Sequence, residues 1–209
     1  MDFQLNLTFF HCLKILTGDI LLWYNIRKGG ICMSNILAID ASTRRTGLAT
    51  IADGVLKYDV ISSAAAAPEK RIGIMRDGII KFIKENNIDT VVMEEVRPDG
   101  MNNHTGKLLT WLQGCIVVAI YEYDKNINVE FIGPSSWRSA LGLQGYRIQR
   151  AEQKKRDIEY ANKTYGLNLA QDQDDEADAI GILSARLRGL QPETKPAKLG
   201  PIGSDESAF

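Results

Sequence analysis

The sequence contains few of the residues that build disulfide or zinc sites. It has three cysteines and two histidines in 209 residues, and Cys12, Cys32 and Cys115 form no C-x-x-C pair. An odd number of widely spaced cysteines predicts reduced thiols in a cytoplasmic protein rather than a disulfide-stapled secreted domain. A chain of this length can bury a full core without such staples.

The sequence also lacks a long apolar run and an excess of basic charge. A transmembrane helix needs about 20 nearly uninterrupted apolar residues, but His11, Lys14 and Asp19 interrupt the apolar stretches of residues 1–32. A signal peptide is disfavoured because Asp2 stands where a basic region is expected. The sequence therefore predicts no membrane association. The formal net charge of −1 argues against a uniformly basic nucleic-acid binder, so any DNA contact depends on a local patch.

The two ends of the chain differ in composition from the part between them. Residues 1–32 show no steady apolar period, and Lys28-Gly29-Gly30 can be encoded by a purine-rich ribosome-binding sequence shortly before Met33. We therefore expect residues 1–32 to be a non-native translated leader or a disordered extension; peptides from this segment in mass spectra of natively expressed protein would refute the leader hypothesis. Residues 190–209 are rich in proline and poor in large apolar groups, which predicts a disordered tail. Residues 33–189 remain as one domain.

Within this domain, apolar strands and amphipathic helices follow one another. Five strands are predicted, at residues 35–40, 46–52, 55–62, 88–95 and 129–132, and Asp53-Gly54 is a hairpin signal between the second and third. Helices are predicted at residues 68–87, 105–123, 149–165 and 174–188, with a further helix start at Pro134. This order predicts an α/β fold in which a mixed sheet is covered by helices on both faces.

Two of the predicted strands end in an acidic residue. Asp40 closes the run NILAID, and Glu94 closes the apolar part of IDTVVMEE. A strand-end aspartate is often only a turn former that caps backbone amides. Ligands of open α/β sheets, however, bind beyond the strand ends. Two acids at two such ends are therefore expected to face each other.

A second acidic pair opens the last predicted helix. Asp175 and Asp178 are three residues apart, so a helix places both on one face. The alternative is a charged helix start that interacts with the helix dipole. Apolar residues such as Ala177 and Ile180 follow at once, which puts the pair next to the buried side. Carboxylates packed together repel one another unless a cation lies between them.

These four acids predict a site for a hard metal ion. Oxygen ligands without a Cys or His cluster favour Mg²⁺, or else Mn²⁺. Two such ions roughly 3.5–4 Å apart can activate water and stabilise the leaving 3′-oxygen of a phosphodiester. We therefore predict that the metal ligands are also the catalytic residues: Asp40, Glu94, Asp175 and Asp178.

Three motifs in the right order resemble the RuvC family of Holliday junction resolvases, in its phage-type branch, within the ribonuclease H-like fold. They are ILAIDASTRRTGLA around Asp40, VVMEEV around Glu94, and DEADAIGI around Asp175 and Asp178. The resemblance selects Glu94 rather than its neighbour Glu95 as the strand-end ligand. It implies a bacteriophage-encoded, Mg²⁺-dependent DNA endonuclease of the host cytoplasm that resolves four-way junctions by paired symmetric nicks. Whether flaps and forks are cut too stays open.

The resemblance also implies basic residues beside the scissile phosphate. Arg138 fits this role by position, as does either Lys154 or Lys155. The only marked basic concentration of the chain consists of Arg138, Arg147, Arg150, Lys154, Lys155 and Arg156. Such runs are usually solvated helix faces, but in a chain of net negative charge we interpret this one as DNA-binding.

The resemblance further implies a homodimer, because two symmetric nicks require two active sites. The candidate interface is the helix at 105–123, with its apolar residues Leu108, Leu109, Leu112, Cys115, Ile116 and Ala119. The loop at 97–107 takes the place of the family's junction-contacting loop but has no aromatic wedge, and its only candidates are Met101 and His104. Trp111 and Trp137 are interpreted as core residues rather than base-stacking ones.

Two other functions are open at this stage. One is a non-catalytic protein that binds branched DNA, although the presence of all four carboxylates argues against a decayed nuclease. The other is an actin-like or sugar-kinase-type ATP-binding domain, because IDASTRRTGLA also resembles the phosphate-binding hairpin of those proteins. They need two such domains and about twice this length, and no second copy of the motif occurs in the sequence.

Overall fold

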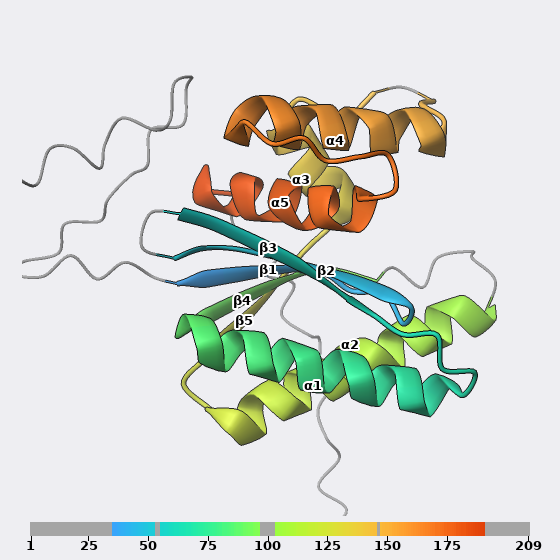
Figure 1. The fold of residues 1–209 in the computed structure, drawn as a ribbon, viewed down its shortest axis with the longest axis vertical. Coiled ribbons are helices and arrows are strands. Elements are labelled where there is room, and N and C mark those ends of the chain that lie inside the picture. The colour runs from blue at the N-terminus through green and yellow to red at the C-terminus, as the bar shows by residue number, and fades with distance from the viewer. Residues whose placement is uncertain (1–34, 53–54, 97–102, 146, 191–209) are drawn as a thin grey trace, which may run out of the picture.

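The structure is a computed structural model that describes residues 35–52, 55–96, 103–145 and 147–190. Five strands form one sheet in the order β3-β2-β1-β4-β5 (Figure 1). The strands are β1 (Ile36–Asp40), β2 (Arg45–Ala52), β3 (Val55–Ser62), β4 (Thr90–Glu94) and β5 (Asn128–Ile132). β2 pairs antiparallel with β1 and β3, whereas β4 pairs in parallel with β1 and β5. The predicted mixed five-stranded sheet is confirmed.

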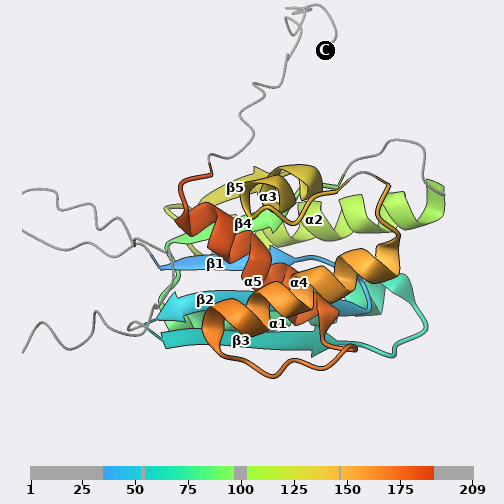
Figure 2. The ribbon, with the colours of Figure 1, turned by 90° about the horizontal axis from the view of Figure 1, so that it is seen from above.

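Five helices cover the two faces of this sheet. They are α1 (Pro68–Asn86), α2 (Asn103–Tyr123), α3 (Pro134–Ala140), α4 (Arg150–Tyr165) and α5 (Asp174–Leu187). α1 and α2 lie on one face, and α3, α4 and α5 lie on the other, with α5 against the strands (Figures 1 and 2). None of the helices among the described residues has the length and apolarity that a membrane span requires.

The sheet separates two apolar cores, because side chains alternate between the faces of a strand. On β1, Leu37 and Ile39 pack toward α1 and α2, and Ala38 packs toward α5. The small Ala38 fits a helix that lies directly against the strands. Each large apolar side chain buried in this way stabilises the fold by about 1.5–3 kcal/mol.

The buried face of α1 follows the predicted spacing. Met75, Ile79 and Ile83 are fully buried, four residues apart on one face of the helix. Pro68 occupies the first helical turn, where its missing N–H costs nothing. The helix ends at Asn87, whose left-handed backbone (φ 49°) terminates it.

One interpretation of α2 is wrong, and the residues named for its dimer interface need correction. Trp111 is not a core residue, because 62% of it is exposed. Most of the residues proposed for a dimer interface are buried in the core of their own chain instead, namely Leu108, Leu112, Ile116 and Ala119. The helix is more apolar than an ordinary surface helix, and its inner face accounts for most of these residues.

Several predictions fall on residues outside the described ranges. These are the leader at residues 1–32, the hairpin Asp53-Gly54, Met101 and the tail from residue 191 onward. Leu190, counted with the tail in the sequence, packs against the core on the α5 side. His104 lies in the first turn of α2 and is exposed.

Candidate active site

The sheet topology brings the four predicted acids to one edge. β1 and β4 are neighbouring parallel strands, so their carboxyl-terminal residues Asp40 and Glu94 end at the same side. α5 begins beside this edge with Asp175 and Asp178 in its first two turns. All four residues line a single groove of about 860 Å³. The structure therefore gathers these four residues as predicted.

A glycine makes the close approach of α5 possible. Gly47 on β2 is the register partner of Asp40. A Cβ atom at position 47 would lie only 1.9 Å from the carbonyl oxygen of Asp175. Because no side chain stands there, the backbone at the start of α5 rests directly on the strand beside Asp40. This contact places Asp175 and Asp178 within the same groove as the strand-end acids.

The acids of this cluster destabilise one another's charged forms. The pKa of Asp40 is raised well above its ordinary value, first by burial and then by the neighbouring charges of Glu94 and Asp175. The pKa of Asp178 is also raised, by burial and then by Asp40. In addition, Asp178 Oδ1 is buried and accepts no hydrogen bond from any described residue. A cation between these groups would relieve both the repulsion and the unpaired oxygen.

Two arginines partly balance this charge. Arg45 Nε donates to Asp175 Oδ2 at 2.6 Å. Arg138 Nη2 donates to Asp178 Oδ2 at 3.1 Å, and its Nη1 lies 3.8 Å from Glu94 Oε2. Asp40 has no such partner among the described residues.

Four carboxylates suit a hard cation, but three of them, Glu94, Asp175 and Asp178, are paired with arginines. Within the described ranges, no three His, Cys, Asp or Glu side chains stand close enough together to hold an ion as they are placed. The groove nevertheless gathers several carboxylates, including that of Asp178, whose buried Oδ1 has no hydrogen-bond partner among the described residues. Such donors fit Mg²⁺ or Mn²⁺. Ion binding would require the acids to turn away from Arg45 and Arg138.

Glu94 accepts two side-chain hydrogen bonds that were not predicted from the sequence. Trp137 Nε1 donates to Glu94 Oε2 at 2.6 Å, and Gln113 Nε2 donates to the Glu94 carbonyl at 2.6 Å. Trp137 is fully buried, so its interpretation as a core residue is confirmed. Its ring lies over Gly181 of α5, where a Cβ would come within 2.5 Å of it. The tryptophan therefore links α5 to the Glu94 carboxylate.

Arg138 is held by a buried carboxylate, Asp157 on α4. Arg138 Nε donates to Asp157 Oδ2 at 3.0 Å, and Gln153 Nε2 donates to Asp157 Oδ1 at 2.8 Å. Asp157 is 1% exposed and adjoins Ile158 on the buried face of its helix. An acid on the buried stripe of an amphipathic helix was a signal in the sequence for such a partner.

The predicted DNA-binding residues divide into two groups. Arg138, Arg150 and Lys154 line the groove, and Lys154 Nζ forms an ion pair with Asp174. Arg147 and Lys155 do not line it.

Both residues outside the groove are exposed to solvent. Lys155 pairs with Glu159 at 3.7 Å on the exposed side of α4. Arg147 lies between α3 and α4 with a left-handed backbone (φ 52°). The structure thus places Lys154, rather than Lys155, beside the carboxylates.

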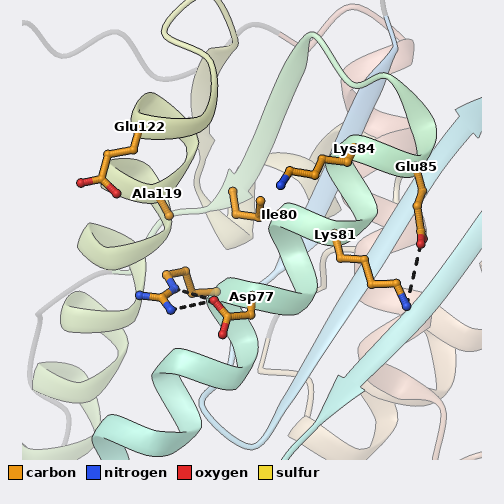
Figure 3. A pocket seen from close by; sticks show the side chains of 8 residues that line it. Asp77, Ile80, Lys81, Lys84, Glu85, Ala119 and Glu122 are labelled. Carbon is orange, nitrogen blue, oxygen red and sulfur yellow. Dashed lines mark hydrogen bonds and ion pairs between the residues drawn. The ribbon is translucent and has the colours of Figure 1, made fainter.

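A second hollow lies between α1 and α2, away from the carboxylate cluster (Figure 3). Its charged groups come in both signs and largely neutralise each other, as with Arg76 and Asp77 at 2.7 Å and Lys81 and Glu85 at 3.8 Å. The dashed lines in Figure 3 mark such pairs. No group of like charges converges there, so the groove at the sheet edge remains the candidate active site.

No protein-family model matches the sequence, and no curated protein matches it either. Solved structures do share its fold. The structure of Thermus thermophilus RuvC aligns with a TM-score of 0.58 and 20% identity over 76% of this chain and 99% of that one. The fold is that of the RuvC Holliday junction resolvases. T. thermophilus RuvC in complex with Holliday junction substrate aligns with a TM-score of 0.56 and 18% identity over 73% of this chain and 92% of that one.

The RuvC-like fold confirms the architecture that the three sequence motifs implied. It accounts for the mixed sheet with helices on both faces. The alignment covers 99% of the Thermus chain, so nearly every part of that chain has a counterpart in this fold. At 18–20% identity the likeness concerns the fold, and the chemistry depends on the residues of the groove.

Proposed function

We propose that this protein is a metal-dependent endonuclease that resolves four-way DNA junctions. The observation that carries the proposal is the convergence of Asp40, Glu94, Asp175 and Asp178 in one groove at the edge of a RuvC-like sheet. Burial and the neighbouring carboxylates raise the pKa of Asp40 and of Asp178, so keeping these acids charged in the groove is costly for the fold. Perturbed acids in a cleft are typical of a functional site.

The four acids would hold two Mg²⁺ ions, or Mn²⁺ in their place. Ions bound in this way can activate a water molecule and stabilise the leaving 3′-oxygen of a phosphodiester. Trp137 would fix the orientation of the Glu94 carboxylate through its 2.6 Å hydrogen bond. Arg138, positioned by Asp157, would turn from Asp178 toward the phosphate. A bidentate guanidinium suits that role.

The substrate proposal rests on the rim of the groove and on the fold. Arg150 and Lys154 on α4 line the groove next to the acids, where the backbone of a DNA strand would need positive charge. Among the solved structures of this fold, one Thermus RuvC is bound to a Holliday junction substrate. These two facts support branched DNA over other phosphodiesters.

We further propose that two copies of the chain pair through the outer face of α2. Trp111, Val118 and Tyr121 are 62%, 55% and 67% exposed, at helical spacings that align them in one stripe. Large apolar residues gathered on one surface are typical of a protein interface. A dimer would supply the two active sites that paired nicks require.

The dimer is tested by sedimentation of the purified chain. Trp111→Glu should shift the protein toward monomer, whereas Tyr58→Glu, a half-exposed aromatic on β3, should not. A wild-type chain that sediments as a monomer at tens of micromolar would refute the interface.

The nuclease is tested on a labelled four-way junction with Mg²⁺, beside a linear duplex of the same sequence. Wild type should nick two opposing strands of the junction symmetrically and leave the duplex intact. Asp40→Asn should abolish cleavage, while the control Asp59→Asn, on an exposed position of β3, should retain it. Tight junction binding without cleavage by wild type would favour a binding protein instead. Cleavage that survives Asp40→Asn would overturn the metal-site assignment.

A further inference from the structure

Arg71 is a buried cation in the first turns of α1. It is 5% exposed and lies four residues before Met75, on the same stripe as the core residues of that helix. Its Nη1 donates to the carbonyl oxygens of Ala65 at 3.0 Å and Ala66 at 2.8 Å. Its Nε is buried and has no hydrogen-bond partner in the part of the chain that the structure describes. The guanidinium is therefore fixed in place with donor capacity left over.

Among the described residues, no carboxylate forms an ion pair with Arg71. The other buried or half-buried arginines near the groove each have acidic partners: Arg45 pairs with Asp175, and Arg138 pairs with Asp157. None of the ion pairs among the described residues includes Arg71. Burying a cation without an anion costs free energy. An anion that enters from outside would remove that cost.

Arg71 lines the same groove as the four acids. Arg44, in the turn between β1 and β2, also lines it; the side chain of Arg44 is exposed and forms no ion pair with another described residue. The turn that carries Arg44 is hydrogen-bonded to the segment that leads into α1. In this bond, the amide of Ser63 donates to the Arg44 carbonyl at 2.9 Å. Arg44 and Arg71 thus form one cationic rim that involves no residue of α4.

We propose that Arg71 and Arg44 bind a non-scissile phosphate of the DNA strand on the rim formed by the β1–β2 turn and α1. The strand would then be held on both sides of the carboxylates, with Arg150 and Lys154 of α4 on the other rim. The planar guanidinium of Arg71, already fixed by two carbonyls, presents its remaining donors to phosphate oxygens at little entropic cost. This inference rests on the proposed function, since it names a further contact of that groove with DNA.

The test is the salt dependence of junction binding in an Asp40→Asn background, where cleavage is blocked. The affinity for a fluorescent four-way junction is measured over a series of KCl concentrations. Each phosphate contact contributes about 0.9 to the slope of log K against log[salt]. Arg71→Gln and Arg44→Gln should each reduce that slope by about this amount and weaken binding by roughly tenfold or more. The matched control is Arg76→Gln, on the same helix, where Arg76 pairs with Asp77 outside the groove.

Two further measurements separate phosphate binding from a purely structural role. Arg71→Lys keeps the charge and should keep most of the salt slope, even if it melts at a lower temperature. Arg44→Gln changes an exposed side chain and should leave the melting temperature unchanged while it reduces the slope. If the parent binds the junction normally and both Arg44→Gln and Arg71→Gln keep its salt slope, this inference is overturned while the proposed function stands. A parent that binds no junction would overturn the proposed function, and this inference with it.

Discussion

The two helical layers of this protein bury different kinds of side chain. The layer of α1 and α2 encloses a mainly apolar core, with Met75, Ile79 and Ile116 fully buried and Arg71 as its one buried charge among the described residues. The layer of α3, α4 and α5 also buries charge: Asp157 is 1% and Glu176 4% exposed. Both layers pack against the same sheet. The difference is that buried ion pairs such as Arg138–Asp157 extend from the groove into the layer of α3, α4 and α5, whereas Arg71 on the other side forms none with a described residue.

Because of this difference, substitutions in the two layers should change the free energy of unfolding by different amounts. In the layer of α5, the acids and arginines depend on one another, so loss of one member leaves a buried charge or donor unpaired. In the layer of α1 and α2, most substitutions change only apolar packing or solvent-exposed positions. Matched substitutions in the two layers therefore test whether the division holds.

The largest effect is expected for Gly47→Ala, at the contact between β2 and α5. The new Cβ would lie 1.9 Å from the Asp175 carbonyl oxygen, and a backbone atom cannot turn aside as a side chain can. We expect a loss of about 3 kcal/mol or more in the free energy of unfolding, together with a loss of junction cleavage. Urea unfolding at constant pH measures the first. Stability within 1 kcal/mol of wild type would mean that α5 shifts freely, against the close contact described above.

A smaller effect, mainly on rate, is expected for Trp137→Phe. Phenylalanine keeps an aromatic ring in the core, although a smaller one than the indole that packs on Gly181, and removes the N–H that donates to Glu94 Oε2. Loss of an outer partner of a metal ligand costs about 10- to 100-fold, and we expect this reduction in the cleavage rate under single-turnover conditions. Trp111→Phe, the same substitution on the exposed side of α2, should leave the rate unchanged. Equal rates in the two variants would show that Trp137 acts only in packing.

A gain in stability is expected for Asp40→Asn without metal. Burial and the charges of Glu94 and Asp175 raise the pKa of Asp40 in the folded state. A carboxyl whose folded pKa is raised loses stability as the pH rises through that pKa, so the neutral amide should gain above it. We expect about 1 kcal/mol, or a melting temperature higher by about 2–4 °C, at pH 8 in EDTA.

Two further conditions serve as controls for the comparison of wild type with Asp40→Asn. At a pH below the unfolded pKa of aspartate the difference should disappear, because both side chains are then neutral. Mg²⁺ should raise the melting temperature of wild type more than that of Asp40→Asn, since binding to the folded state stabilises it. A variant that melts below wild type at pH 8 in EDTA would contradict the repulsion among these acids.

The smallest effect is expected for Gly73→Ala in α1. A Cβ at position 73 would meet no atom within 4 Å. Alanine in the interior of a helix is favoured over glycine by roughly 0.5–1 kcal/mol, so this variant should be slightly more stable and fully active. The melting temperatures of Gly73→Ala and Gly47→Ala, measured side by side, compare the two layers directly. Destabilisation by Gly73→Ala would mean that this face of α1 is covered by a partner.

Much of the fold could be predicted from local sequence patterns. The strands ending at Asp40 and Glu94 are short apolar runs, and α1 repeats its buried residues every four positions. Those patterns depend only on which face of an element is buried. The shared edge for Asp40 and Glu94 followed from two strands that both end in acid, and the parallel pairing of β1 and β4 confirms it.

The partners of the acids could not be predicted in the same way. The contact of Trp137 with Glu94 joins residues 43 positions apart through the placement of α3 against the sheet, which no local pattern reports. Trp111 and Trp137 look alike in the sequence, yet one is exposed and the other buried. For Arg71 and Asp157 a signal was present, because each charged residue falls on the buried stripe of its helix. Such positions are where a buried charge needs a specific partner.

α5 combines two tasks that many enzymes divide between separate elements. It packs against β1, β2, β3 and β4. It also carries Asp175, Asp178 and Gly181, on which the Trp137 ring packs. Because it is the last helix of the described chain, a ribosome must complete nearly the whole domain before the sheet gains this cover. A product truncated before residue 174 would lack half of the acids and the centre of one core together. Incomplete chains should therefore be degraded as unfolded protein rather than persist as inactive competitors for DNA.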